Sequence, residues 1–208
     1  MKEYIRHQRG RMFQSDFFEF FSKVHPAIPF AFWLPICAAI LGFALVREVT
    51  ALPYVAVFFL FGFFGWQLLE YFIHKKIFHL EGTGPMSRRF HDIVHGFHHT
   101  YPDDDMRLVM PPVVSITVAT AIALGLYFVR KPETTVPLWT GIVCGYLWYD
   151  FLHWSVHFRK PLTRWGKKLR SHHMAHHFAN AQRNFGISNM WLDRLLGTLQ
   201  TTEAKHKS

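Results

Sequence analysis

The sequence predicts an all-α integral membrane protein, in which four transmembrane helices carry a cytosolic, His-rich helical cap that holds a dinuclear metal site. Three observations lead to this prediction. The 208 residues contain four long apolar stretches, most Lys and Arg residues lie outside them, and ten histidines follow or end these stretches in four groups. A chain of this length most often forms one domain, so we expect residues 1–208 to be a single membrane-embedded domain.

The four apolar stretches each have a length that suits a membrane span. They cover residues 27–46, 52–69, 111–129 and 136–152, and none contains Lys, Arg, Asp or Glu before Asp150. Because about 17–25 residues cross ~30 Å of hydrocarbon, we expect four transmembrane helices within 27–152. In the alternative arrangement one stretch, in the first instance the third, is a re-entrant or buried helix.

The connections and the charge distribution predict the topology. Short turns at 47–51 and 130–135 make two helical hairpins, and the His-rich segment 74–110 joins them. Residues 1–26, 75–110 and 153–208 contain 20 of the 23 Lys and Arg residues, which places all three segments in the cytosol by the positive-inside rule. We expect a multi-pass protein of the bacterial cytoplasmic membrane or endoplasmic reticulum, with its site on the cytosolic side. The segregated charge argues against nucleic-acid binding despite a net charge of +9.

Two segments flank the predicted spans. Residues 1–26 predict an interfacial N-terminal segment, because five Phe residues between 13 and 21 alternate with Asp16, Glu19 and Lys23, as in an amphipathic helix in the lipid headgroups. Residues 153–208 predict the cytosolic C-terminal cap, where 190–196 again mixes apolar and charged residues. Ordinary packing on the cap is the alternative for both patterns.

The histidine groups have the spacing of metal ligands. Neutral imidazole binds iron, zinc, copper and nickel, and helical residues three or four apart share a face. A single ion rarely needs more than six ligands, so ten imidazoles imply two metal ions. Because residues five apart diverge on a straight α-helix, we expect the chain to end its helix or bend between the first two. The candidate ligands are His74, His79, His95, His98, His99, His153, His157, His173, His176 and His177.

Imidazole ligands also need partners on their outer nitrogen. Asp150, three residues before His153, and Glu70, four before His74, are the candidates; the alternative is that both simply mark where helices leave the bilayer. His91 lies on the face of His95 and is a candidate outer partner, whereas His172 points about 100° away from His173 and is expected to be a bystander. His7, His25 and His206 have no partner nearby in the sequence.

Residues 95–112 resemble a family signature. The stretch HGFHHTYPDDDMRLVMPP is similar to the HGxHHxxPxDxxRLVxPP pattern of fatty acid 2-hydroxylases, within the fatty acid hydroxylase/sterol desaturase superfamily, although Asp103 to Asp105 offer three choices for the single Asp. Tyr149-Asp150-x-x-His153, and the sequence NFGIS at 184–188 followed by Trp191, resemble further family landmarks. The resemblance covers about residues 70–198.

The resemblance implies a dinuclear, all-histidine centre, generally of iron, that activates dioxygen and inserts one oxygen atom into an acyl C–H bond, at C2 in the most similar group. It carries over all ten candidate ligands and makes Asp150 and Tyr149 the candidate catalytic residues. It also makes Arg107 the candidate substrate-binding residue, expected to meet an anionic head group or carboxylate; the alternative is a plain positive-inside residue. The residues alone do not choose iron over zinc.

The implied partners are a membrane lipid or fatty acyl substrate and a separate electron donor. His25-Pro26 is followed by Ala27-Ile28 rather than by the HPGG haem motif of fused cytochrome b5 domains, and we find neither a Cys set for an iron–sulfur cluster nor a GxGxxG sequence. We therefore expect a ferredoxin or cytochrome b5 with its reductase. Alternatives are a carotenoid or sterol hydroxylase or desaturase of the same superfamily, and a membrane metal transporter, which is disfavoured because the predicted spans lack histidine at their middles.

Overall fold

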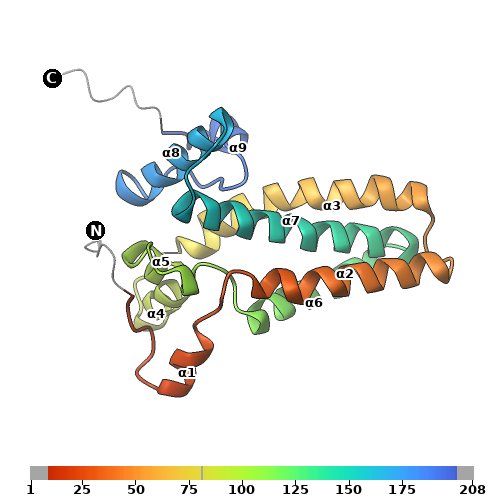
Figure 1. The fold of residues 1–208 in the computed structure, drawn as a ribbon, viewed down its shortest axis with the longest axis horizontal. Coiled ribbons are helices and arrows are strands. Elements are labelled where there is room, and N and C mark those ends of the chain that lie inside the picture. The colour runs from red at the N-terminus through yellow and green to blue at the C-terminus, as the bar shows by residue number, and fades with distance from the viewer. Residues whose placement is uncertain (1–8, 81, 201–208) are drawn as a thin grey trace.

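A bundle of four long helices forms the body of the molecule. The structure, a computed structural model, describes residues 9–80 and 82–200, and this part of the chain is helical with no strand. Figure 1 shows the long helices side by side, with the shorter helices gathered at one end. The long helices are α2 (Ile28–Val46), α3 (Leu52–Ile73), α6 (Pro112–Val129) and α7 (Pro132–Phe158).

The shorter elements form a cap over that end of the bundle. α1 (Asp16–Phe21) precedes the bundle, α8 (Arg164–Phe178) and α9 (Trp191–Leu195) follow it, and the remaining short elements connect its two hairpins. These connecting elements are η1 (His74–Phe78), α4 (Pro85–His91), η2 (Asp92–Gly96), α5 (Phe97–Thr100) and η3 (Asp105–Arg107). The His-rich segments therefore lie at one end of the bundle, as the sequence predicts.

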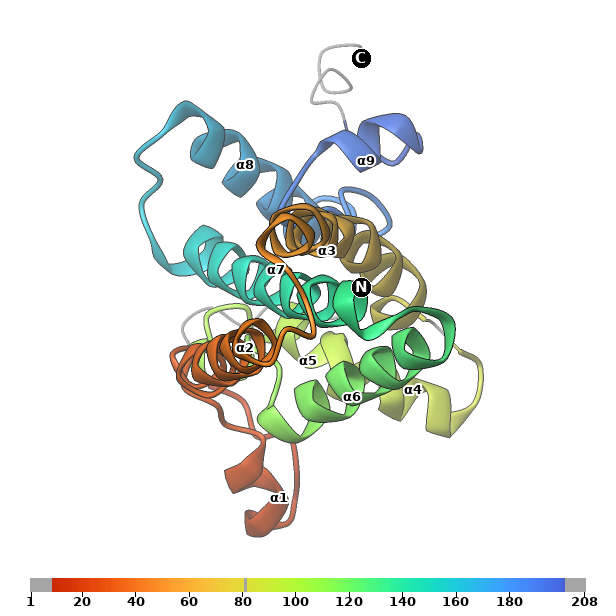
Figure 2. The same cartoon turned by 90° about the vertical axis from the view of Figure 1, so that its right-hand side faces the viewer.

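Helix α7 is the central helix of the bundle. It packs against α2, α3 and α6, and the view along the bundle in Figure 2 shows it between them. Aromatic side chains fill the core: the ring of Trp139 lies 6.0 Å from that of Trp33, and the ring of Tyr146 lies 5.5 Å from that of Trp66. The Trp33 indole also donates to Ser115 Oγ, which ties α2 to α6. Helix α7, whose last turns carry the third histidine pair, is thus packed against neighbouring helices along its length.

Two glycines allow α3 and α7 to approach closely. A Cβ on Gly141 would lie 2.1 Å from the Phe59 carbonyl oxygen, and one on Gly62 would lie 2.1 Å from that of Leu138. Small residues at helix contacts permit such backbone approach in membrane bundles. Because α3 ends at the first histidine pair and α7 carries the third, this contact fixes the relative position of two histidine groups.

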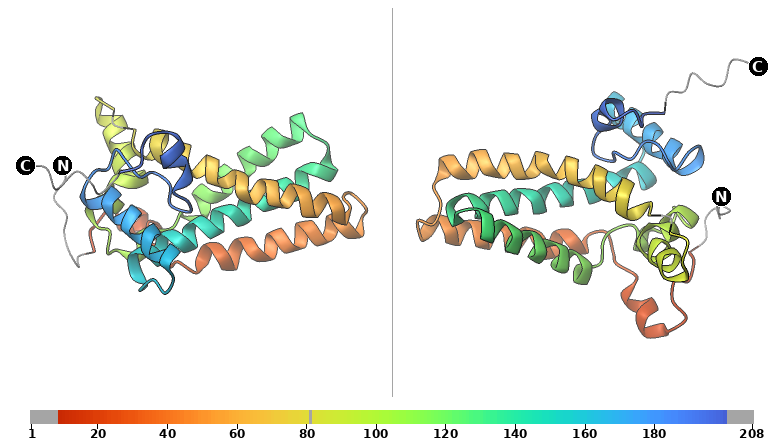
Figure 3. Two further views of the ribbon diagram at one scale, coloured as in Figure 1. Left: turned by 90° about the horizontal axis from the view of Figure 1, so that it is seen from above. Right: turned by 180° about the vertical axis from the view of Figure 1, so that it is seen from behind.

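Three segments are long and apolar enough to cross a membrane: Ile28–Val46, Leu52–Phe78 and Asp105–Val129. Their exposed apolar side chains, such as Phe43, Phe61 and Phe128, suit contact with lipid. The fourth predicted span, α7, is not among them, because its Trp, Tyr, His and acidic residues dilute its hydropathy. Helix α7 nevertheless runs the length of the bundle (Figure 3).

Two of the connecting elements that carry histidines, η1 and η2, are π-helical turns. In η1 the His79 amide donates to the His74 carbonyl, and at the end of η2 the Phe97 amide donates to the Asp92 carbonyl. This hydrogen-bonding pattern widens the helix, so residues five apart come onto one face. The bend expected between His74 and His79 is therefore present as a π-helix that ends at His79.

Candidate metal centre

All ten histidines singled out from the sequence meet at the capped end of the bundle. They come from four segments: the end of α3 with η1, the η2–α5 segment, the end of α7, and α8. They form two groups, and in each group one nitrogen from every ring lies within 4.8 Å of the others. The first group is His74, His79, His95, His99 and His176; the second group is His98, His153, His157, His173 and His177.

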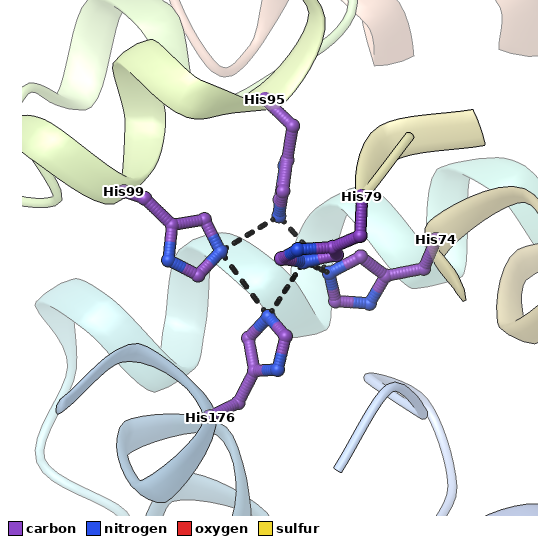
Figure 4. Close-up of side chains that lie close together, drawn as sticks. All are labelled: His74, His79, His95, His99 and His176. Carbon is purple, nitrogen blue, oxygen red and sulfur yellow. Dashed lines mark hydrogen bonds between the residues drawn. The ribbon is translucent and has the colours of Figure 1, made fainter. Parts of the chain in front are cut away.

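In the first group the five Nε2 atoms form a closed ring of contacts. Starting at His74, each Nε2 lies 3.0–3.2 Å from the next, through His95, His99, His176 and His79 and back to His74. Figure 4 shows the five imidazoles pointing at one another; they come from the segment at the end of α3 with η1, from the η2–α5 segment and from α8. Two nitrogen ligands about 2.1 Å from one ion and about 90° apart would be ~3.0 Å from each other, so this spacing fits one metal ion.

The second group is less regular but has the same character. His153 Nε2 lies 3.1 Å from His98 Nε2, and His173 Nε2 lies 2.8 Å from His157 Nε2 and 3.0 Å from His177 Nε2. Three of its members are buried, while His157 and His177 are partly exposed. These rings therefore also have the donor set and the convergence of a metal site.

The two HxxHH motifs do not each supply one group. His95 and His99 belong to the first group and His98 to the second, whereas His173 and His177 belong to the second and His176 to the first. The spacing predicts that the three histidines of each motif share one helix face, but the two sides of that face point at different groups. Each motif therefore contributes ligands to both groups.

In the first group, the position of the ring protons leaves Nε2 lone pairs available to bind a cation. His74 Nδ1 donates to the Phe185 carbonyl at 2.6 Å, and His176 Nδ1 donates to the Arg183 carbonyl at 2.7 Å. With the proton on Nδ1, the Nε2 lone pairs of both rings point at the centre of the group. Converging lone pairs repel one another unless a cation lies between them, so these residues fit a metal ion.

Burial keeps these imidazoles neutral. Loss of solvation, together with neighbouring imidazoles, lowers the pKa of His79 to about 3. Burial likewise lowers the pKa of His176 to about 4, although the hydrogen bond to Arg183 opposes the change. The pKa values of His95, His98, His99, His173 and His177 also lie well below the ordinary value, for the same primary reason. Neutral rings are the form that binds metal.

Asp150 and Tyr149 lie buried on α7, one turn before His153. The Tyr149 ring is 5.7 Å from the His153 ring. The expected Asp150–His153 partnership is not formed: within the described part of the chain, Asp150 Oδ2 and His153 Nδ1 each lack a hydrogen-bond partner. Two such atoms on adjacent turns of one buried helix are open to a ligand from outside the chain.

Arg107 pairs with carboxylates of the protein itself rather than with the expected lipid anion. Its side chain is only 2% exposed, it pairs with Asp104 at 2.5 Å and closely with Glu19, and it lies over the Phe97 ring. Glu19 also accepts the Met12 and Phe13 amides; burial opposes its ionisation, but these hydrogen bonds and the Arg107 charge keep the pKa of Glu19 below its usual value. Two carboxylates thus compensate Arg107, which ties α1 to the loop after the first HxxHH motif.

Glu70 forms no hydrogen bond with His74, contrary to one of the two expectations for it. Its Oε1 accepts the amides of Ile187 and Ser188 at 3.1 and 2.7 Å. It therefore holds the segment whose Phe185 carbonyl accepts from His74, and its influence on that histidine passes through the backbone.

Asp193 is a buried residue that the sequence did not reveal. It accepts four hydrogen bonds, from the Phe185 and Gly186 amides, the Thr198 hydroxyl and His172 Nε2. Although burial opposes ionisation, these bonds keep the pKa of Asp193 below its ordinary value. His172, expected to be a bystander, is thus its partner. Only the apolar neighbours of Asp193 in 190–196 could have indicated burial.

Comparison with known proteins places the chain in a protein family. The fatty acid hydroxylase family model matches residues 59–198, which include all ten histidines. The chain belongs to the fatty acid hydroxylase family. It is 33% identical over 198 residues to dihydroceramide fatty acyl 2-hydroxylase FAH2 of Arabidopsis thaliana, covering 95% of this chain and 83% of that protein. It is also 33% identical to the fatty acid 2-hydroxylase of Mus musculus, covering 95% of this chain and 58% of that protein.

Structure comparison gives the same relationship. A solved structure described as "Full length scs7p (only hydroxylase domain visible)" matches with a TM-score of 0.84 and 28% identity, covering 93% of this chain and 73% of that one. The ceramide very long chain fatty acid hydroxylase SCS7 of Saccharomyces cerevisiae is 32% identical over 169 residues, covering 80% of this chain and 43% of that protein. As a member of this family, the chain is an oxidoreductase of the monooxygenase type.

Proposed function

We propose that this chain is a dioxygen-dependent lipid hydroxylase that inserts one oxygen atom into a C–H bond of a fatty acyl chain, at C2. The observation that carries the proposal is the pair of five-histidine groups at the capped end of the bundle. The relatives named for fatty acyl 2-hydroxylation support the position of attack, and those named for ceramide support a sphingolipid as the carrier of the acyl chain.

Each histidine group holds one metal ion in this proposal. Iron, when bound there, supplies the redox chemistry that an unactivated C–H bond requires; zinc fits the same imidazoles but brings no redox chemistry. The chain's own contribution is to present ten neutral nitrogens from rigid helices, so that little rearrangement accompanies binding.

The acyl chain approaches the second histidine group from the bundle side. An apolar pocket lies among α2, α3, α6 and α7, and its lining includes Trp33, Trp66, Trp139 and Tyr146. Tyr146 lies one turn before Asp150 on α7, so this pocket reaches towards the turn that carries Tyr149 and Asp150. We assign the pocket to the hydrocarbon tail. Tyr149 and Asp150, as catalytic residues, orient the polar end of the acyl group below His153.

The same proposal includes an arrangement of the chain in the membrane. α2, α3, α6 and α7 span the bilayer, the histidine groups face the cytosol, and α1 lies in the headgroups with Phe17, Phe18, Phe20 and Phe21 all more than half exposed. Exposed Phe side chains next to a span favour contact with lipid over contact with water. Electrons come from a separate small donor, a ferredoxin or cytochrome b5 with its reductase.

Product analysis tests the proposal. Cells that express the chain under labelled dioxygen should accumulate acyl chains hydroxylated at C2 with one labelled oxygen atom, and the His98→Ala variant should not. Hydroxylated carotenoids or sterols, or acyl chains with a new double bond, would instead assign the chain to another reaction of the superfamily.

A further inference from the structure

The two histidine groups differ in the hydrogen-bond partners of their outer ring nitrogens, Nδ1. In the first group, the Phe185 and Arg183 carbonyls accept from His74 and His176. In the second group, four of the five rings have a buried Nδ1 with no hydrogen-bond partner in the part of the chain that the structure describes: His98, His153, His173 and His177. A hydrogen bond on the outer nitrogen fixes the orientation of an imidazole and strengthens it as a ligand, so the groups are unequal as metal sites.

The segment that carries the two carbonyls has a specialised backbone. Between Arg183 and Phe185 lies Asn184, whose φ of 60° places it in the left-handed region, which Asn adopts more readily than most residues. Its side chain donates to the His172 carbonyl and accepts the Gln200 amide, which holds this conformation. The left-handed residue reverses the chain locally, so two carbonyls on either side of it reach two different histidines.

Two buried carboxylates hold this segment in place. Asp193 accepts the amides of Phe185 and Gly186, and Glu70 accepts those of Ile187 and Ser188, so four consecutive amides are bound by two side chains. A Cβ on Gly186 would lie 2.2 Å from the Asn189 carbonyl oxygen, which shows how tightly the turn is closed. Asp193 and Glu70 are 0% and 2% exposed, so water cannot replace them.

We propose that the two histidine groups are unequal metal sites: the first binds its ion more tightly because Asp193 and Glu70 clamp residues 183–188, and the second releases its ion first. Asp193 and Glu70 are positioning residues, which act on His74 and His176 through the backbone. The second group also has two partly exposed members, His157 and His177, against one in the first group, His99, which favours the same order of release. The inference rests on the proposed dinuclear centre.

Stepwise removal of metal from the full-length protein in detergent provides the first test. Zinc-loaded protein is dialysed against a graded series of chelator concentrations, and the bound zinc is counted. We expect two steps, each of one ion per chain, separated by at least tenfold in free zinc. A single step releasing both ions together would overturn the inference, whereas failure to load two ions would overturn the dinuclear centre itself.

Single-site variants assign the steps. His153→Ala leaves the first group complete and His74→Ala leaves the second, and zinc affinity is measured in each by competition with a chromophoric chelator. We expect the His153→Ala protein to bind zinc at least tenfold more tightly than the His74→Ala protein. The opposite order, or equal affinities, would contradict the assignment.

Carboxylate variants then separate positioning from general stability. In the His153→Ala background, Asp193→Asn should weaken zinc binding by about 10–100-fold, and in the His74→Ala background it should leave the affinity unchanged. Glu70→Gln, which retains an acceptor oxygen, should weaken the first site less than Glu70→Ala. Asp105→Asn, at a surface carboxylate, and Val143→Ala, in the bundle core, are the controls for charge and for lost stability. Equal weakening of both sites by Asp193→Asn would show a merely structural role.

Discussion

His98 and His99 are consecutive in the chain, yet their imidazoles belong to different histidine groups. His99 Nε2 lies 3.0 Å from His95 Nε2 in the first group, and His98 Nε2 lies 3.1 Å from His153 Nε2 in the second. The groups are also in contact, since the rings of His99 and His177 stack at 4.3 Å. A short helix, α5, thus couples the two sites, and a movement of its backbone would alter both.

This arrangement predicts the effect of removing ligands from the second group. His98→Ala, His157→Ala and His177→Ala should each abolish hydroxylation and lower the metal content of purified protein from two ions towards one, because each removes one of five imidazoles from the same site. Metal analysis and product assays measure both effects. His25→Ala is the matched control, since His25 belongs to neither group. Full metal content and turnover in any two of the three variants would remove these residues from the ligand set.

Arg107→Gln should destabilise the protein rather than alter substrate affinity. Loss of one partner from a buried ion pair costs about 3–5 kcal/mol, because the other charge is left uncompensated, here on Asp104 and Glu19. Thermal unfolding should therefore occur at a clearly lower temperature, with KM unchanged in the fraction that remains folded. Arg9→Gln breaks an exposed pair with Asp105 and should cost less than about 1 kcal/mol. A raised KM at unaltered stability would instead support contact with the lipid anion.

Acidification should destabilise the metal-free protein before most carboxylates titrate. The unfolded chain takes up protons on its histidines near pH 6.5, whereas burial lowers the pKa of folded His79 to about 3 and of His176 to about 4. Below pH 6.5 the unfolded state thus binds more protons, so the stability falls with falling pH until about pH 3–4. Thermal unfolding measured between pH 8 and pH 5 should show this fall. A pH-independent melting temperature over that range would contradict buried, neutral imidazoles.

The proposed topology predicts the accessibility of tags. Tags at residue 1, within 81–89 and at residue 208 should be reached by a reagent confined to the cytosolic side, whereas a tag within 130–135 should not. The reason is that 20 of the 23 Lys and Arg residues lie in residues 1–26, 75–110 and 153–208, which contain the first three tag positions. Termini on opposite sides would exclude α7 as a fourth span.

The electron donor should bind by electrostatic attraction to basic residues on α8. On α8, Lys167 and Lys168 are exposed, and the nearby Arg170 donates to the Arg159 carbonyl. Lys167→Glu with Lys168→Glu should raise the KM for an acidic donor several-fold, and the rate for the unmodified enzyme should fall as salt rises. Lys131→Glu, at the other end of the bundle, provides the control. Sustained turnover without any donor would show that the reaction is not a reductive monooxygenation.

The sequence predicted which histidines come together better than it predicted how they are grouped. Spacing and residue type identify ten imidazoles and four apolar helices, because both depend on local periodicity. The division of each HxxHH motif between two sites depends on how helices from distant parts of the chain face one another, which spacing cannot reveal. The pairing of Arg107 with Glu19 joins residues 88 apart, and the role of Asp193 arises from amides that it meets only after folding. Contacts of this kind leave no pattern in a single sequence.

The π-helical turn between His74 and His79 makes the first site depend on the length of the chain as well as on its composition. Deleting one residue from Lys75–Ile77 would let the segment continue as a regular α-helix, with four residues between hydrogen-bonded partners instead of five. Every ligand would still be encoded, yet His79 would be rotated away from His74. A genome carrying such a deletion would retain all ten histidine codons and still specify a protein with an incomplete first site, so a search for intact motifs alone would misjudge it.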